Sequence, residues 1–164
     1  MLKKISLFLG ADHGGIPLKE HLKAKLADHG VTVEDLGTHG SASTDYPDFA
    51  EKVARRVVET GDCGILVCGS GTGMAISANK IAGIRAANVW DVTSARLSKE
   101  HNNVNILCLG SRLLGADVAW EAVQAWMNAE FQGGRHQTRV NKISELEKGK
   151  KSIERFLNAK PIGN

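Results

Sequence analysis

A cysteine followed by a run of glycines is the segment of this sequence best suited to chemistry. Cys68 ends an apolar, strand-like run, and residues 69–73 read Gly-Ser-Gly-Thr-Gly before a short helical pattern. Backbone N–H groups in such a loop, together with a helix N-terminus, stabilise an anion. The same field increases the thiolate fraction of a cysteine. Cys68 is therefore a candidate base that removes a proton beside a carbonyl, with the loop N–H groups stabilising the enediolate that forms.

The loop alone leaves a second interpretation open, because cysteines are often buried for packing. Cys68 would then be a core residue beside an ordinary tight turn. The segment lacks the Gly-Lys-Ser/Thr ending of a nucleotide-binding P-loop, and it is a weak dinucleotide-binding fingerprint. Cys63 and Cys108 lie inside strand-like runs, so we assign both to the core.

Polar residues at two other places can face the same ligand. Asp12 and His13 end the first strand-like run, where a carboxylate and an imidazole can hold a hydroxyl, a ring oxygen or a phosphate. The alternative for Asp12 is that it caps the next helix. Tyr46, the only tyrosine, precedes Pro47 and is either a wall of the pocket or a residue at the start of a helix.

A histidine and three arginines are candidates for an acid and for phosphate binding. A neutral His101 can act as general acid near pH 7, or it can cap a helix C-terminus. Arg112 ends the fifth strand region. Arg135 and Arg139 are four residues apart and share a helix face, so with His136 they can grip a phosphate, although a solvated basic turn is the alternative.

Other histidines give no sign of a metal site. His21, His29 and His39 have no partner at ligand spacing, so we expect surface residues, no metal and no cofactor.

Strand-like and helix-like patterns alternate along the chain. Apolar runs predict strands at residues 5–9, 31–33, 63–68, 84–89 and 106–109. Between and after them, helical patterns cover residues 17–26, 49–58, the stretch up to Asn79, 91–100, 119–127 and the segment after Gly133-Gly134. The alternation predicts an α/β fold: a Rossmann-like three-layer αβα sandwich with a five-stranded parallel sheet and a C-terminal helical arm.

The predicted topology groups the candidate residues. Ligands of parallel α/β sheets bind outside the carboxyl ends of the strands. That rule selects residues 11–15, 69–73 and 110–112. The last helix has many charges and an apolar stripe (Val140, Ile143, Leu146, Ile153 and Leu157), so we expect a second subunit to cover it.

Length and composition limit the class of protein. The chain has 164 residues, which fits a single domain over 1–164, with 135–164 as an arm that packs on a partner subunit. Residues 135–164 hold eight Lys/Arg against three Asp/Glu, and the remaining 134 residues hold 13 against 15. This basic segment lacks interleaved aromatics, so nucleic-acid binding is not expected. We expect no membrane span, no signal peptide and a cytoplasmic location.

Taken together, these segments resemble the ribose-5-phosphate isomerase B family, which also includes isomerases of allose and galactose 6-phosphates. The resemblance covers about residues 5–150. The motifs in family order are Asp12-His13, Thr44-Asp45-Tyr46-Pro47, Cys68-Gly69 with Gly71 and Gly73, Asn79-Lys80, Gly83-Ile84-Arg85-Ala86, Ser94-Ala95-Arg96-Leu97-Ser98, His101-Asn102, Gly110-Ser111-Arg112 and Gly133-Gly134-Arg135-His136.

The resemblance implies a role for each candidate residue. Cys68 would shuttle the proton between C1 and C2, with Ser70 in the catalytic loop, and His101 would open the sugar ring. The substrate contacts would come from Asp12, His13, Tyr46, Gly69, Gly71, Thr72, Gly73, Asn102, Arg112, Arg135, His136 and Arg139. The family is metal-free and forms dimers or tetramers in which the C-terminal arginines reach a neighbour's site.

This sequence departs from the family pattern at a few positions. Ser70 stands where threonine is common and keeps the hydroxyl, while Trp90 and Thr93 are less usual and leave the length of the sugar open. Residues 151–164 extend past the usual end. The expected reaction interconverts ribose 5-phosphate and ribulose 5-phosphate. The alternatives are a hexose 6-phosphate isomerase and a flavodoxin-like module that binds a nucleotide or metabolite without turnover.

Overall fold

The computed structural model describes residues 6–149 and confirms the predicted alternation of strands and helices. The strands are β1 (Ser6–Ala11), β2 (Thr32–Asp35), β3 (Cys63–Cys68), β4 (Ala86–Asn88) and β5 (Ile106–Gly110). The helices are a 3-10 turn η1 (His13–Gly15) and α1 (Ile16–Asp28), α2 (Tyr46–Thr60), α3 (Thr72–Ala78), α4 (Val92–Asn102), α5 (Ala116–Asn128) and α6 (Arg135–Glu147). β4 is shorter than expected, at three residues.

All strand pairs in the sheet are parallel, in the order β2-β1-β3-β5-β4. The chain leaves β1 toward β2 on one side and later returns to β3 on the other side. The switch in direction therefore falls between β1 and β3, and the crevice outside their carboxyl ends is where a ligand is expected.

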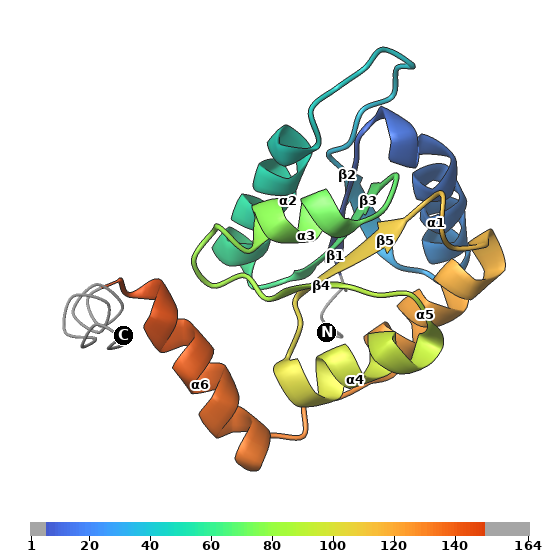
Figure 1. The fold of residues 1–164 in the computed structure, drawn as a ribbon. Coiled ribbons are helices and arrows are strands. Elements are labelled where there is room, and N and C mark those ends of the chain that lie inside the picture. The colour runs from blue at the N-terminus through green and yellow to red at the C-terminus, as the bar shows by residue number, and fades with distance from the viewer. Residues whose placement is uncertain (1–5, 150–164) are drawn as a thin grey trace, which may run out of the picture.

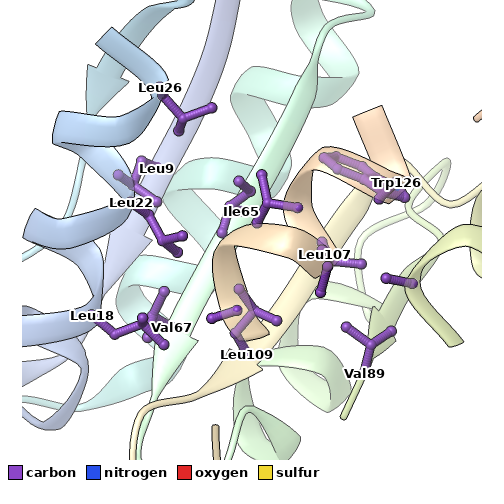
Figure 2. Packing of buried hydrophobic residues seen from close by; sticks show 14 of the residues in the cluster. Leu9, Leu18, Leu22, Leu26, Ile65, Val67, Val89, Leu107, Leu109 and Trp126 are labelled. Atoms are coloured by element: carbon purple, nitrogen blue, oxygen red, sulfur yellow. The ribbon is translucent and has the colours of Figure 1, made fainter. Parts of the chain in front are cut away.

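Helices cover both faces of the sheet (Figure 1). One core packs α1, α4 and α5 against the sheet, and includes Leu22, Ile65, Val67 and Trp126 (Figure 2). The other core packs α2 and α3, and includes Leu66 and Cys68. Side chains alternate between the faces along a strand, so Cys68 leaves β3 on the α2 and α3 side.

Helix α6 stands off the main body and touches it near both ends (Figure 1). His136 and Val140 are buried near its start, and the Glu147 carboxylate accepts a hydrogen bond from the Gly83 N–H (3.0 Å) at its end. The expected apolar stripe is therefore partly covered by the same chain, while Ile143 and Leu146 remain exposed. Ile153, Leu157 and the extension 151–164 lie outside the described residues.

The structure also bears on the expectations about a membrane span and about three histidines. Within residues 6–149, no helix has the length and apolar character needed to cross a membrane. His29 and His39 are exposed as expected, but His21 is half-buried, and its Nε2 is buried without a hydrogen-bond partner in the described part of the chain. The surface assignment of His21 was therefore wrong.

Candidate active site

A cavity of about 410 Å³ opens at the carboxyl ends of β1, β3 and β5. It brings together the three segments that the predicted topology selected. Its lining consists of Asp12, His13, Gly14, Tyr46, Cys68, Gly69, Ser70, Gly73, Arg112 and Leu113. The cavity lies at the switch between β1 and β3, as the rule for parallel sheets requires.

Cys68 lies at the inner wall of this cavity and is 5% exposed. The Gly71 N–H donates a hydrogen bond to its Sγ atom (3.1 Å). A donor aimed at sulfur stabilises a thiolate more than it stabilises a thiol. The Gly71 N–H and the Cys68 sulfur are thus held together at the wall of the cavity.

The glycines after Cys68 are required by close approaches. Gly71 has a φ of 79°, which L side chains rarely adopt, and a Cβ atom there would collide with the Asn88 side chain. A Cβ on Gly73 would lie 2.6 Å from the Tyr46 ring, and one on Gly69 would lie 3.3 Å from the Arg112 guanidinium. The glycines thus let Tyr46 and Arg112 form walls of the cavity.

Two hydrogen bonds hold Ser70 and Thr72 in the loop. The Thr72 N–H donates to the Ser70 hydroxyl (3.3 Å), and the Thr72 hydroxyl lies 3.0 Å from the amide group of Asn88 on β4. Ser70 lines the cavity and Thr72 does not. Asn88 thus supports the loop, and no pattern in the sequence marked this residue.

Asp12 has two roles in this geometry. One carboxylate oxygen accepts a hydrogen bond from the Gly15 N–H (3.0 Å) and caps η1, which was the alternative interpretation of this residue. Asp12 is nevertheless a lining residue of the cavity. Its second oxygen is therefore the one available to a ligand in the cavity.

Hydrogen bonds connect the segment after β5 with the segments after β1 and β3. The Ser111 hydroxyl donates to the Gly14 carbonyl (2.6 Å) across 97 residues, and the Arg112 N–H donates to the Gly69 carbonyl (3.1 Å). These bonds place the Arg112 side chain beside the glycine loop, where a guanidinium suits an anionic group of the substrate.

Cys108 is confirmed as a core residue and is fully buried behind the site. Burial, with a smaller effect of Cys68, raises its pKa far above the ordinary value of a thiol. Cys108 therefore stays protonated, and Cys68 is the thiol that faces the cavity. Cys63 at the start of β3 is only half-buried.

His101 and Asn102 lie at the other end of the sheet from Cys68. They end α4, and Asn105 just beyond accepts a hydrogen bond from Gly64 at the start of β3 (2.9 Å). A five-residue strand spans roughly 15 Å. Within one chain, His101 is therefore not part of the cavity that holds Cys68, and Asn102 lines a different cavity of about 540 Å³ beside α6.

His136 packs against His101 instead of facing solvent. The two imidazoles are stacked with centroids 4.3 Å apart, and His136 is 7% exposed. Burial, followed by His101, Arg135 and Arg139, lowers the pKa of His136. Both arginines are exposed on the first turns of α6, on the shared face that their spacing predicted.

Arg85 is a residue of this second cluster that the sequence analysis quoted in a motif without giving it a role. Its Nε atom donates to the carbonyls of Asn102 (3.1 Å) and Asn103 (2.9 Å), at the C-terminus of α4. Burial lowers the pKa of its guanidinium. A cation at a helix C-terminus is favourable, and here it fixes the turn that follows His101.

Comparison with known proteins agrees with this fold. The family model described as Ribose/Galactose Isomerase matches residues 7–143. The ribose-5-phosphate isomerase B of Escherichia coli is 47% identical over 147 residues, which are 89% of this chain and 97% of that protein.

Solved structures give the same result. The ribose-5-phosphate isomerase B of Clostridium thermocellum is 51% identical with a TM-score of 0.86, covering 87% of this chain and 97% of that one. The ribose-5-phosphate isomerase B of Mycoplasma genitalium, solved with bound ribulose-5-phosphate, is 40% identical with a TM-score of 0.85, covering 88% and 97%. The chain therefore belongs to the Ribose/Galactose Isomerase family, in its ribose-5-phosphate isomerase B group, and is an enzyme of the aldose–ketose isomerase class.

Proposed function

We propose that this enzyme interconverts ribose 5-phosphate and ribulose 5-phosphate through an enediolate, with Cys68 as the base. The observation that carries the mechanism is the hydrogen bond from the Gly71 N–H to the Cys68 Sγ atom (3.1 Å), at the wall of a cavity that is also lined by Asp12, Tyr46 and Arg112. The substrate is supported by the Mycoplasma genitalium relative, which was solved with bound ribulose-5-phosphate.

The proposed proton transfer uses one thiol in both directions. The Cys68 thiolate takes the proton from C2 of the open-chain aldose, and the electron pair of that C–H bond forms the C1–C2 double bond of the enediolate. The negative charge on oxygen is stabilised by N–H groups of residues 69–73 and by the Ser70 hydroxyl. A proton then moves from the C2 hydroxyl to the oxygen on C1, the thiol returns its proton to C1, and the carbonyl is left at C2.

Ring opening requires a general acid that donates a proton to the ring oxygen. We assign it to His101 of a second subunit, because His101 lies at the opposite end of the sheet from Cys68. In a two-fold symmetric dimer, the same pair of surfaces meets twice, so two such sites form. Asn102 reaches the sugar from the same helix end.

Phosphate binding is divided in the same way. Arg112 and His13 belong to the cavity with Cys68, whereas Arg135 and Arg139 are exposed on α6 of the other subunit. Guanidinium groups bind phosphate by paired, charge-assisted hydrogen bonds. The match from residue 7 to residue 143 supports one isomerase domain. We propose a cytoplasmic location, because a reducing compartment would keep the Cys68 thiol available as a base.

The assigned base is tested by Cys68→Ala, with Cys63→Ala at the other end of β3 as a matched control. We expect kcat to fall by about 10²- to 10⁴-fold in Cys68→Ala, because a general base contributes that much, and to stay near wild type in the control. Exchange of the C2 proton with deuterated solvent should disappear in parallel. A Cys68→Ala enzyme that isomerises at the wild-type rate would falsify the assignment.

The shared site is tested by mixing two inactive proteins, Cys68→Ala and Arg135→Ala. A hybrid dimer has one site with both residues intact, so random mixing should restore about a quarter of the wild-type activity. No recovery after subunit exchange, confirmed by mass spectrometry, would show that each site lies within one chain.

The family description names galactose as well as ribose, so a hexose 6-phosphate is the second candidate substrate. The comparison of kcat/KM on ribose, allose and galactose phosphates separates the two. If kcat/KM were higher for a hexose phosphate, that sugar would replace ribose 5-phosphate as the proposed substrate. The proposed roles of Cys68 and His101 would not change.

A further inference from the structure

Two hydrogen bonds join His13 and Thr44, although 31 residues separate them. The His13 N–H donates to the Thr44 hydroxyl oxygen (3.1 Å), and the Thr44 N–H donates to Nδ1 of the His13 ring (3.2 Å). The bonds close the long loop between β2 and α2 onto η1, at the rim of the cavity (Figure 1). Thr44 does not itself line the cavity, but it contacts a residue that does.

The second of these bonds determines where the His13 ring carries its proton. A backbone N–H only donates, so Nδ1 has to offer its lone pair. A neutral imidazole holds a single N–H, which is then on Nε2. The ring nitrogen that remains for a ligand is therefore a donor.

The other neutral tautomer fits the geometry less well. A proton on Nδ1 would have to point to the Thr44 hydroxyl oxygen, which is 3.5 Å away, at the limit of a hydrogen bond. That oxygen already accepts the His13 N–H. The Thr44 N–H would also lose this acceptor, which costs free energy in a partly buried position.

The loop that carries Thr44 is fixed at its base as well. The Lys19 side chain is completely buried, and its Nζ atom donates to both carboxylate oxygens of Asp35 (3.1 and 2.9 Å) and to the Thr38 carbonyl (3.0 Å). The Thr38 N–H donates to the Ala11 carbonyl (3.0 Å). The loop is thus held near its start by the contacts of Thr38 and near its end by the contacts of Thr44 with His13.

We infer that Thr44 is a positioning residue that selects the tautomer of His13 with its proton on Nε2, so that this N–H donates to a phosphate oxygen of the substrate. The ligand in this inference rests on the proposed function, whereas the tautomer does not. The arginines then supply the positive charge at the phosphate, and His13 supplies one directed hydrogen bond that sets its orientation.

The tautomer is measured directly in protein labelled with ¹⁵N-histidine, without substrate and at a pH where imidazoles are neutral. Two-bond ¹H–¹⁵N correlations should show His13 Nδ1 unprotonated and Nε2 protonated, with the His13 signals assigned by their loss in His13→Gln. Added inorganic phosphate should shift Nε2 more than Nδ1. A protonated Nδ1, or an equal mixture of tautomers, overturns the inference.

Two variants separate the N–H of Thr44 from its hydroxyl. Thr44→Val keeps the N–H and should keep the tautomer, whereas Thr44→Pro removes the N–H and should give a mixture and raise KM for ribose 5-phosphate about ten-fold. Ser43→Ala, at the exposed neighbouring position, is the control for the loop. An unchanged tautomer in Thr44→Pro overturns the inference.

The experiment stays decisive if Thr44→Pro does not fold, because the wild-type and Thr44→Val spectra still report the tautomer. It also separates the two proposals. Failure of the wild-type enzyme to convert ribose 5-phosphate would overturn the proposed function, but it would leave the spectrum recorded without substrate unaffected.

Discussion

The imidazole rings of His101 and His136 lie parallel, with an angle of 5° between their planes and 4.3 Å between their centroids. One ring ends α4 and the other begins α6, so the stack joins the arm to the helix that carries the proposed acid. His136 is buried in this contact. We therefore expect His136 to orient His101, and not to bind phosphate as the sequence analysis proposed.

The effect of the stack is tested by replacing His136 with an aromatic and with a small residue. His136→Ala removes the stacking partner of His101. It should lower kcat about ten-fold with little change in KM, because the His101 imidazole would no longer be held in the orientation needed to donate its proton. His136→Phe keeps a flat ring in place and should restore most of the rate. An equal rise of KM in both variants would instead assign His136 to the phosphate.

The lowered pKa of His136 predicts how the free energy of unfolding changes with pH. Burial, His101, Arg135 and Arg139 lower the pKa of His136 in the folded protein, so below about pH 6.5 the unfolded chain binds a proton that the folded protein resists. The free energy of unfolding should therefore fall as the pH decreases from 7.5 to 5.5.

Denaturant titrations of wild type and His136→Phe at both pH values measure this contribution. The other histidines are common to both proteins, so the difference between the two pH dependences belongs to His136 and its contact with His101. The variant should lose less stability on acidification. A steeper loss in the variant would contradict the predicted direction.

The contact between Gly73 and Tyr46 predicts a local effect of a single methyl group. In Gly73→Ala, the new Cβ would lie 2.6 Å from the Tyr46 ring, and the ring must move away from the cavity wall. Overpacking of this kind costs about 1–3 kcal/mol, and KM should rise. Gly40→Ala is the matched control, because no atom lies within 4 Å of its Cβ position.

A second substitution shows whether Tyr46 is the cause. Tyr46→Ala removes the ring, so Gly73→Ala should cost much less stability in that background than in the wild type. The N-terminal turn of α3 accepts alanine at least as well as glycine, since Gly73 has no positive φ. An equal cost in both backgrounds would show that the strain lies elsewhere.

The sequence predicted the cavity because its residues obey a rule of topology. Asp12, Cys68 and Arg112 each follow a strand, and the carboxyl ends of parallel strands share one edge of the sheet. The same rule separates His101 from these residues. His101 lies at the end of a helix, and helices of such a fold end at the opposite edge of the sheet, where the next strand begins. The resemblance grouped His101 with Cys68 as one site, whereas within one chain the structure places them at opposite ends of the sheet.

The patterns in the sequence did not predict which side chains contact one another across long stretches of the chain. The Thr44 N–H finds the His13 ring across 31 residues, and the ammonium of Lys19 is buried on a helix where its neighbour Leu18 belongs to the apolar stripe. Such pairings depend on how loops fold back in three dimensions, and no local periodicity encodes them. The quoted Thr-Asp-Tyr-Pro motif was the one signal that marked Thr44.

The two buried thiols behind the glycine loop should differ in reactivity. Cys68 reaches the cavity and receives the Gly71 N–H, whereas Cys108 is fully buried and its pKa is raised by burial. Since the thiolate is the nucleophile, iodoacetamide at pH 8 should modify Cys68 and leave Cys108 intact in the folded enzyme. Peptide mapping by mass spectrometry follows both residues, and activity should decline in step with Cys68 modification.

Ribose 5-phosphate should slow the modification of Cys68 by filling the cavity, and denaturant should expose Cys108 to the reagent. Modification of Cys108 at the same rate as Cys68 in the folded enzyme would contradict this assignment of the two thiols.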